Sequence, residues 1–266
     1  MTSFFSALRH QGNVFLALLN REEERRRHNP VEALLGVLEP LGFLVVMAAL
    51  RYFTHTNAYV PVGTSQVVYL ATGILPHYFF IVIATRSSKD WTSASRRFPI
   101  EQRLDLYLVA IILRCADYLI LGVLLFGGLY AYGISDAAPY DYGSIFQALA
   151  AIAMLGFGWG VFQLTIGEIF PVWAYINGAI TRGLVLFSGI FFEPDTLPPD
   201  IRYPLSFNPI LQAIALFKRG FYPNYSSLTL DKTYLLECAI AFVLMGLIFD
   251  RITRRREGLP RRRVRR

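Results

Sequence analysis

Six long stretches of predominantly apolar residues leave this chain few ways to fold in water. A helix that crosses a bilayer needs about 20 such residues. Residues of the AVILMFWYC set make up 54% of the 266 residues and charged residues 17%, whereas soluble domains carry about 25% charge. The chain is therefore predicted to be an all-α integral membrane protein. The six predicted spans are residues 31–53, 66–85, 106–132, 144–166, 172–192 and 234–249.

The basic residues predict how these spans are oriented. Lys and Arg accumulate on the cytoplasmic side of short loops. Five precede the first span, five lie between the second and third spans, and nine follow the sixth, which makes nineteen of the 26 in the chain. The loops 54–65 and 133–143 carry none. We therefore expect both termini in the cytoplasm.

The two ends of the chain have separate roles in this prediction. Apolar residues at helical spacing predict an amphipathic helix on the membrane surface within residues 1–30, although a disordered tail is an alternative. Arg9 interrupts the apolar core that a cleaved signal peptide would need. The basic tail 251–266 is expected to anchor the orientation and to contact anionic lipid, and no nucleic-acid partner is expected. The apolar residues of the N-terminal pattern are Phe4, Leu8, Phe15 and Leu18.

The segment between the fifth and sixth spans does not fit a simple six-helix bundle. It contains an apolar stretch at 205–217, which is too short to cross a bilayer. Asn208 and Pro209 form a typical helix start, and Lys218 to Gly220 a matching stop. The sequence therefore predicts a short apolar helix in an outer re-entrant hairpin, with an ordinary outer loop as the alternative.

Catalytic signatures do not appear in the sequence. No GxxxxGK[ST] loop, HExxH or GxSxG motif exists, and Cys115 and Cys238 both fall in apolar runs. Asp195 and Asp200 in the outer segment resemble paired carboxylates of a glycosyl transferase, but acids beside prolines are more often turn formers. We therefore expect no catalytic residues, no metal site and no enzymatic activity in this chain.

Charged residues inside predicted spans are costly and mark partners or polar paths. Arg114 and Asp117, three residues apart on one helix, are expected to neutralise each other. Arg182 has no local partner, so it either pairs across the bundle or faces a path for an anionic substrate. The acids available for such pairing are Glu32, Glu39 and Glu237.

Aromatic residues make up 15% of the chain, and two interpretations of their role are open. Most are expected in an interfacial belt or in the core. Some are alternatively expected to line a substrate path, since aromatic faces suit the apolar faces of sugar rings. With Arg182, the candidate path residues are Tyr78, Phe79, Trp159, Phe187, Phe191 and Phe192.

Four stretches of the sequence resemble one family, the capsular polysaccharide export permeases of the ABC type-2 transporters, which are close to those exporting O-antigen and teichoic acid. They begin at Leu19 (LNREEERRRHNPVEALLGVLEPLGFLVV), Tyr69 (YLATGILPHYFF), Ile166 (IGEIFPVW) and Ser188 (SGIFFEPDTLPPDIRYPLSFNPILQAIALFKRGFYPNY). The last carries the most specific spacing. The family often has His and Glu where this chain has Gln212 and Leu216, so no role is transferred to those two positions.

The resemblance implies a single transmembrane domain over 1–266, with a six-span bundle at 31–250, in the bacterial inner membrane. Two copies of the chain would form one channel for a lipid-linked, anionic surface polysaccharide. Two ATP-binding cassette subunits would bind ATP and Mg²⁺, so this chain would need no cofactor, and periplasmic and outer-membrane export proteins are further expected partners. The implied ATPase-coupling residues are Trp91, Arg96, Arg97, Glu168, Phe170 and Pro171, and the implied outer-hairpin residues are Leu197, Pro198, Asn208, Pro209 and Arg219.

Several other functions remain alternatives at this point. An exporter of O-antigen, teichoic acid or a small molecule would share the architecture. A secondary transporter would show internal repeats and broken spans, and no clear repeat relates 31–132 to 144–249. A membrane glycosyltransferase would need a larger outer or soluble site than these loops provide.

Overall fold

The computed structural model describes residues 16–20, 23–24, 28, 30–54, 60–86, 103–170 and 172–257. Over these residues the chain forms helices and turns without a β-strand, so the predicted all-helical fold class is confirmed. The helices are α2 (Pro30–Phe53), α3 (Gln66–Ile81) with its π-helical continuation η2 (Val82–Arg86), α5 (Arg103–Ala131), the 3-10 helix η4 (Ser135–Ala137), α6 (Tyr142–Ile169), α7 (Trp173–Phe187), the 3-10 helix η5 (Pro194–Thr196), α8 (Pro199–Ser206), α9 (Pro209–Arg219) and α10 (Lys232–Glu257).

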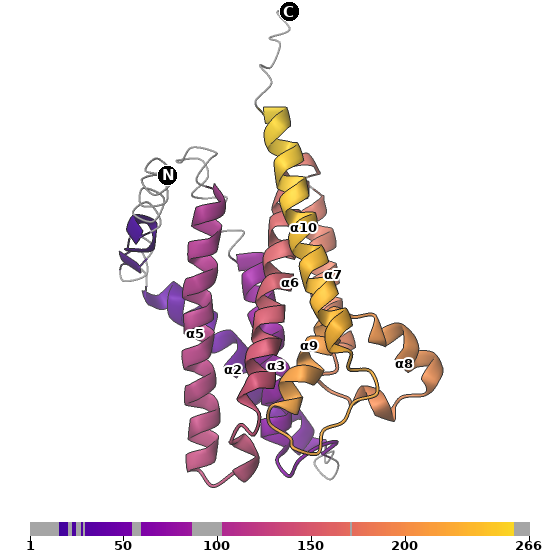
Figure 1. Cartoon of the computed structure of the whole chain (residues 1–266). Helices are drawn as coiled ribbons and strands as arrows, with labels where there is room; N and C mark the ends of the chain where they lie inside the picture. Colours follow the sequence, from indigo (N-terminus) through magenta and orange to yellow (C-terminus); the bar gives the residue numbers. More distant parts are fainter. Residues whose placement is uncertain are drawn as a thin grey trace, which may run out of the picture.

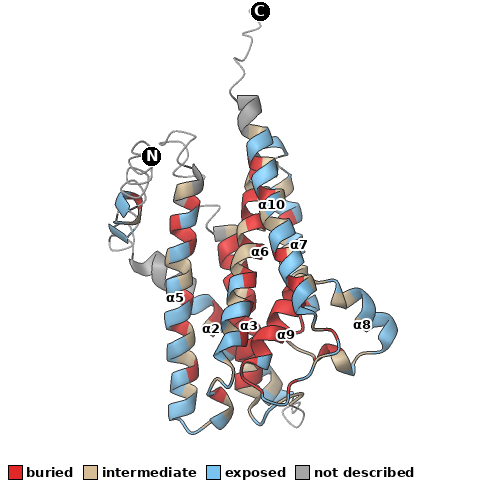
Figure 2. Ribbon diagram, in the orientation of Figure 1, coloured by how far each residue is buried: buried red, intermediate tan, exposed pale blue. Residues whose placement is uncertain are grey.

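Three stretches of the described chain are long and apolar enough to cross a membrane. They are Gln66–Thr85, Tyr107–Ala131 and Tyr142–Ile169, and they coincide closely with the second, third and fourth predicted spans. The outer surface of α5 carries exposed apolar side chains (Figure 2), among them Val123 and Leu124, which are 72% and 68% exposed. An apolar face of this length is typical of a helix that contacts lipid or another helix.

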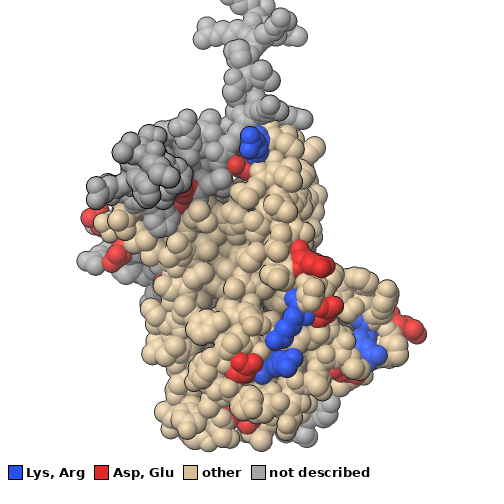
Figure 3. Space-filling model, viewed as in Figure 1, with Lys and Arg blue, Asp and Glu red and all other residues tan. Residues whose placement is uncertain are grey.

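The long helices run up and down between two ends of the molecule (Figure 1). The end of α5 and the start of α6 lie at the lower end, with the start of α3. The beginning of α5 and the ends of α6 and α10 lie at the upper end. On the face seen in Figure 3, charged side chains gather around the lower right, and an uncharged band separates them from those near the top.

The centre of the bundle is the contact between α6 and α10, where glycines let the helices approach closely. A Cβ atom on Gly158 would collide with the backbone of Phe242 and Val243. On the opposite helix, a Cβ on Gly246 would lie 2.7 Å from the Gly158 carbonyl oxygen. Close backbone approach through small residues is the usual way in which helices pack inside membranes.

Two helix boundaries differ from the predicted spans. Helix α7 has 15 residues and ends at Phe187, five residues before the predicted end of the fifth span. At 1.5 Å per residue it is about 22 Å long, short of the roughly 30 Å hydrocarbon core. The apolar run continues, but Gly189 takes a φ of 68° and turns the chain away. Helix α10 extends to Glu257, beyond the predicted end at residue 249.

The predicted N-terminal surface helix falls mostly outside the described residues. Phe4, Leu8 and Phe15 belong to that part of the chain. Leu18 lies in a described helical segment, residues 16–20, and its side chain is buried, whereas Leu16 is exposed. One apolar side chain turned inward agrees with an amphipathic segment, and the interfacial position remains a prediction.

Candidate functional site

Helix α9 is the predicted short apolar helix, and its start and stop are as expected. The Asn208 side chain caps it by accepting a hydrogen bond from the Ile210 N–H (3.0 Å), and Pro209 takes the first helical position. Gly220 follows its last residue. All residues from 210 to 218 are buried, and the helix packs against α3, α6 and α10. An 11-residue helix is thus enclosed by protein without crossing a bilayer.

A buried ion pair fixes α9 to the turn that follows α7. The Lys218 ammonium donates to the Gly189 carbonyl (2.8 Å) and lies 3.4 Å from Glu193 Oε2. The Tyr225 hydroxyl donates to the other carboxylate oxygen, Glu193 Oε1 (2.6 Å). Lys218 also lies over the ring of Tyr69 on α3, 4.0 Å from its centroid. Both charged side chains are less than 10% exposed.

This cluster joins α9, the turn after α7, helix α3 and the segment that carries Tyr225. Buried charges are found where partners compensate the loss of water, because an isolated buried ion costs several kcal/mol. Lys218 was expected only to end the helix, whereas its neighbour Arg219 is exposed. No local signal in the sequence could have identified the pair, because Glu193 lies 25 residues from Lys218 and Tyr225 lies 32 from Glu193.

A second set of polar contacts ties the loop before α3 to the loop between α5 and α6. Asp136 accepts from both the backbone and the hydroxyl of Thr64 and from the Ser65 N–H. Burial acts to raise the pKa of Asp136, but these hydrogen bonds outweigh it and hold the pKa below its ordinary value. Gly63, with a φ of 83°, lies directly against Asp136 and the Tyr222 ring, so that no side chain fits there.

The C-terminal end of α9 holds the start of α6 in place. The Gly220 carbonyl accepts from the N–H groups of Tyr140 (2.8 Å) and Asp141 (2.9 Å). Asp141 caps α6 through Ser144, whose hydroxyl and N–H both donate to it. These hydrogen bonds hold the pKa of Asp141 below its ordinary value. The end of the bundle at which α6 begins is therefore a connected polar assembly built on α9.

The predicted path aromatics fall into separate groups. Tyr78 and Phe191 both contact the ring of Phe43 on α2, the first tilted and the second edge to face, with ring centroids 5.6 and 6.3 Å from that of Phe43. Phe79 is buried against Tyr118. Trp159 belongs to a cluster of α6, α7 and α10, and Phe187 is exposed at the end of α7, while Phe192 is half-buried. The Trp159 cluster includes Phe162, Trp173, Phe242 and Phe249.

Sequence reasoning missed the aromatic partners that define these groups. Phe43 and Phe242 lie on helices distant in sequence from Tyr78 and Trp159. The Trp159 indole N–H donates to the Asn177 side chain (2.9 Å), which joins α6 to α7. A polar Asn within an apolar run is a signal that could have identified this contact.

The charges inside the predicted spans have different surroundings. Arg114 and Asp117 lie 3.7 Å apart, so their expected local pairing is confirmed. Arg182 is exposed on α7, and its Nε donates to the Gly178 carbonyl (2.8 Å). Glu39 and Glu237 are exposed and form no ion pair with it among the described side chains, and the side chain of Glu32 lies outside that set.

The predicted coupling residues lie at the other end of the molecule or beyond the described residues. Glu168 and Phe170 are exposed at the C-terminal end of α6. Trp91, Arg96, Arg97 and Pro171 lie outside the described residues. Since α6 has 28 residues, its two ends are about 42 Å apart.

A polar contact near this end ties α3 to α5 and α6. The π-helical turn η2 leaves carbonyls free of regular helix partners. Tyr107 of α5 donates its hydroxyl proton to the Ile83 carbonyl (2.9 Å), and Gln163 of α6 donates to the Ala84 carbonyl. Gly160 leaves room for the Tyr107 hydroxyl. Three helices are joined where the chain enters the predicted coupling segment.

The chain is similar to bacterial capsule export proteins over nearly its whole length. It is 24% identical to the capsule polysaccharide export inner-membrane protein CtrC of Neisseria meningitidis over 92% of this chain and 93% of that protein. It is 25% identical to the protein of the same description, BexB, of Haemophilus influenzae over 93% of each. The polysialic acid transport protein KpsM of Escherichia coli is 21% identical over 82% of this chain and 84% of its own.

These homologues confirm the resemblance that the four sequence stretches indicated. No protein-family model matches the chain.

Proposed function

We propose that this chain is the membrane-spanning subunit of an ATP-driven exporter that moves a lipid-linked, anionic surface polysaccharide of the capsule type across the inner membrane. The observation that carries the proposal is the similarity to capsule export inner-membrane proteins along more than nine tenths of the chain. The names of these relatives favour capsule over O-antigen or teichoic acid. Long apolar helices with exposed apolar faces support a place in the membrane.

The proposed topology has six crossings and two cytoplasmic termini. Nineteen of the 26 basic residues fall before the first span, between the second and third, or after the sixth, which fits the positive-inside rule. The proposed fifth crossing is α7, and its length of about 22 Å would be accommodated by local thinning of the bilayer. The hairpin with α9 enters from the outer side and remains enclosed by α3, α6 and α10, as irregular backbone at membrane depth requires.

In the proposed assembly two copies of the chain form one channel and two ATPase subunits supply the free energy. Closure of the ATPases would push on Glu168, Phe170 and the predicted coupling loop, residues 87–104. The contacts of Tyr107 and Gln163 with η2 would let α3, α5 and α6 move together. Because α6 reaches the Gly220 carbonyl at the outer end, its displacement would shift the hairpin.

Many weak contacts suit the transport of a polymer better than one tight site, since conduction requires that binding also permits release. Arg182 and the aromatic residues Tyr78, Phe79, Trp159, Phe187, Phe191 and Phe192 are the proposed weak contacts. ATP and Mg²⁺ would act in the partner subunit, and periplasmic and outer-membrane proteins would receive the polymer.

Deletion of the gene tests the proposed function in the cell. Surface polysaccharide, measured by staining and composition analysis, should disappear and return with the unaltered gene. The variant Arg96→Glu/Arg97→Glu should insert in the membrane but fail to restore export, because it removes positive charge from the proposed coupling segment. Lys232→Glu, at the opposite end of the molecule, is the control. Normal surface polymer in the deletion strain would contradict the proposal.

A further inference from the structure

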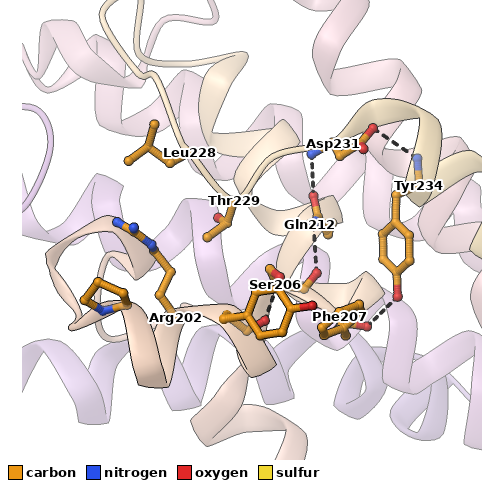
Figure 4. A pocket seen from close by; sticks show the side chains of 10 residues that line it. Arg202, Ser206, Phe207, Gln212, Leu228, Thr229, Asp231 and Tyr234 are labelled. Atoms are coloured by element: carbon orange, nitrogen blue, oxygen red, sulfur yellow. Dashed lines mark hydrogen bonds between the residues drawn. The ribbon is translucent and has the colours of Figure 1, made fainter.

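A cleft opens on the outer segment, between α8, the start of α9 and the start of α10 (Figure 4). Its volume is about 460 Å³, within the range of about 300–1,000 Å³ typical of small-ligand sites. It is separate from the aromatic groups around Phe43 and Trp159. None of the sequence predictions assigned a role to it.

Hydrogen bonds fix the walls of the cleft. The Gln212 amide bridges two of them, since it donates to the Ser206 carbonyl and accepts from the Asp231 N–H, both at 2.8 Å. The Tyr234 hydroxyl donates to the Phe207 carbonyl (2.8 Å). These contacts hold the end of α8 against the start of α10. A preformed cleft loses little conformational freedom when a ligand binds.

One positive charge in the cleft forms no ion pair among the described residues. Arg202 of α8 extends its guanidinium toward the segment that carries Leu228 and Thr229 (Figure 4). No carboxylate or carbonyl of the described residues accepts from this guanidinium. The two carboxylates beside that segment bond to backbone N–H groups instead, since Asp231 caps α10 through Thr233 and Tyr234, and Asp195 accepts from Leu228.

Aromatic rings line the cleft beside this charge. The rings of Tyr203 and Phe207 meet edge to face with centroids 5.2 Å apart, and Phe207 meets Tyr234 in the same way at 6.3 Å. Tyr203 is 69% and Phe207 53% exposed. Exposed rings with electron-rich faces suit the C–H groups on the apolar side of a sugar. A guanidinium beside them suits a carboxylate, which it can bind with two parallel hydrogen bonds.

From this combination we infer that the cleft between α8 and α10 is a binding subsite for an acidic glycosyl unit, in which Arg202 binds the carboxylate and Tyr203 and Phe207 contact the sugar ring. The inference rests on the proposed function, and it adds a place on the outer side where the emerging polymer is held. Release from this subsite would be easy, because a single half-buried cation that water still reaches contributes little affinity.

Binding of defined oligosaccharides to the purified full-length chain tests the inference. Tetragalacturonate is the acidic probe and maltotetraose the neutral one, and both are titrated calorimetrically in detergent at low salt. The unaltered chain should bind tetragalacturonate more tightly, and added salt should weaken that binding. Arg202→Gln should weaken it about fivefold, as expected for loss of about 1 kcal/mol, and Arg202→Lys should retain most of it. Lys232→Gln, an exposed cation outside the cleft, is the matched control.

Tyr203→Ala separates the ring contact from the charge, since it should weaken binding of both probes. Equal binding by Arg202→Gln and the unaltered chain would overturn the inference, and so would equal affinity for the two probes. Because the basic tail 251–266 also attracts anions, the comparison of Arg202→Gln with Lys232→Gln decides the matter, and Tyr203→Ala replaces Arg202→Gln if that variant fails to fold. Failure of the gene deletion to remove surface polymer would contradict the proposed function instead, so the two failures are distinguishable.

Discussion

Helices α9 and α5 are both apolar, but they have opposite surroundings. Helix α9 has 11 residues, and every side chain from 210 to 218 is buried inside the protein. Helix α5 has 29 residues and carries a row of exposed apolar side chains. Apolar composition alone therefore does not tell whether protein or lipid surrounds a helix. Length distinguishes the two, because α9 is too short to cross a bilayer and α5 is long enough.

The two helices also differ in how their charged residues are paired. Lys218 lies in the last turn of α9 inside the protein, where the Gly189 carbonyl and the Glu193 carboxylate compensate its charge. The charged pair of α5, Arg114 and Asp117, is partly exposed and lies within a single helix. Enclosure by protein permits an ion pair between segments 25 residues apart on α9 and the turn after α7, whereas the pair on α5 joins two residues only three positions apart on one helix.

Removing one member of the buried pair should have the largest effect on stability. Glu193→Gln should lower the free energy of unfolding by about 3–5 kcal/mol, because it leaves the Lys218 ammonium buried without a counter-charge. Unfolding in mixed micelles, followed by tryptophan fluorescence, measures it. The combined variant Lys218→Met/Glu193→Leu should be less destabilised than Glu193→Gln.

The adjacent exposed residue supplies the control for this experiment. Arg219→Met should leave the free energy of unfolding within about 0.5 kcal/mol of the unaltered chain. Ion pairs exposed to solvent contribute only about 0–1 kcal/mol to stability. A loss of less than about 1 kcal/mol in Glu193→Gln would therefore mean that water reaches Lys218.

Matched leucine truncations on α9 and α5 sharpen the comparison directly. Leu211 is 1% exposed and Leu124 is 68% exposed. Leu211→Ala should cost about 2–5 kcal/mol, because it opens a cavity, whereas Leu124→Ala should cost less than about 0.5 kcal/mol. The same micelle unfolding assay applies to both. Equal losses would show that the exposed face of α5 is covered by another part of the assembly.

A glycine pair on α6 tests the close contact with α10. Gly158→Ala should cost about 1–3 kcal/mol, because its methyl group would collide with the backbone of Phe242. Gly167→Ala on the same helix meets nothing within 4 Å and should be neutral or stabilising by up to about 1 kcal/mol. Thermal melting of the two purified variants compares them. A Gly158→Ala variant as stable as Gly167→Ala would contradict the helix packing.

The smallest expected effect concerns Asp136 in the outer loops. Its pKa is below the ordinary value of 3.8, so its hydrogen bonds to Thr64 and Ser65 stabilise the fold above that pH. The contribution should disappear as the pH falls through 3.8 and below. Asp136→Asn should therefore melt at a lower temperature than the unaltered chain at neutral pH, and the gap should close in acid. A gap that does not change with pH would show that the charge of Asp136 is not responsible.

The sequence predicted those features that depend on neighbouring residues. The Asn208 cap of α9 and the Arg114–Asp117 pair are local patterns, and the structure confirms them. The second, third and fourth predicted spans are local patterns too, and each coincides with a helix long and apolar enough to cross a membrane. The predicted end of the fifth span at residue 192 was wrong, because α7 ends at Phe187 and the apolar run from 188 to 192 forms a turn. Hydropathy carries no information about the φ of 68° that Gly189 adopts there.

Features that depend on distant residues were not predictable from one sequence. Lys218 and Glu193 meet only because α9 packs against the turn after α7. The cleft beside Arg202 likewise requires α8 to lie against the start of α10. The aromatic groups around Phe43 and Trp159 likewise depend on contacts between different helices. The sequence therefore indicated which residue types could line a path, but not where their side chains lie.

Isolation of the chain with its partners tests the central claim most directly. A tagged chain is purified in mild detergent from its native cell, and the proteins that accompany it are identified and quantified by mass spectrometry. The account predicts a Walker-type ATPase in one-to-one ratio with this chain, and its loss in the Arg96→Glu/Arg97→Glu variant. Recovery of the chain alone, even after crosslinking in the cell, would contradict the exporter assignment.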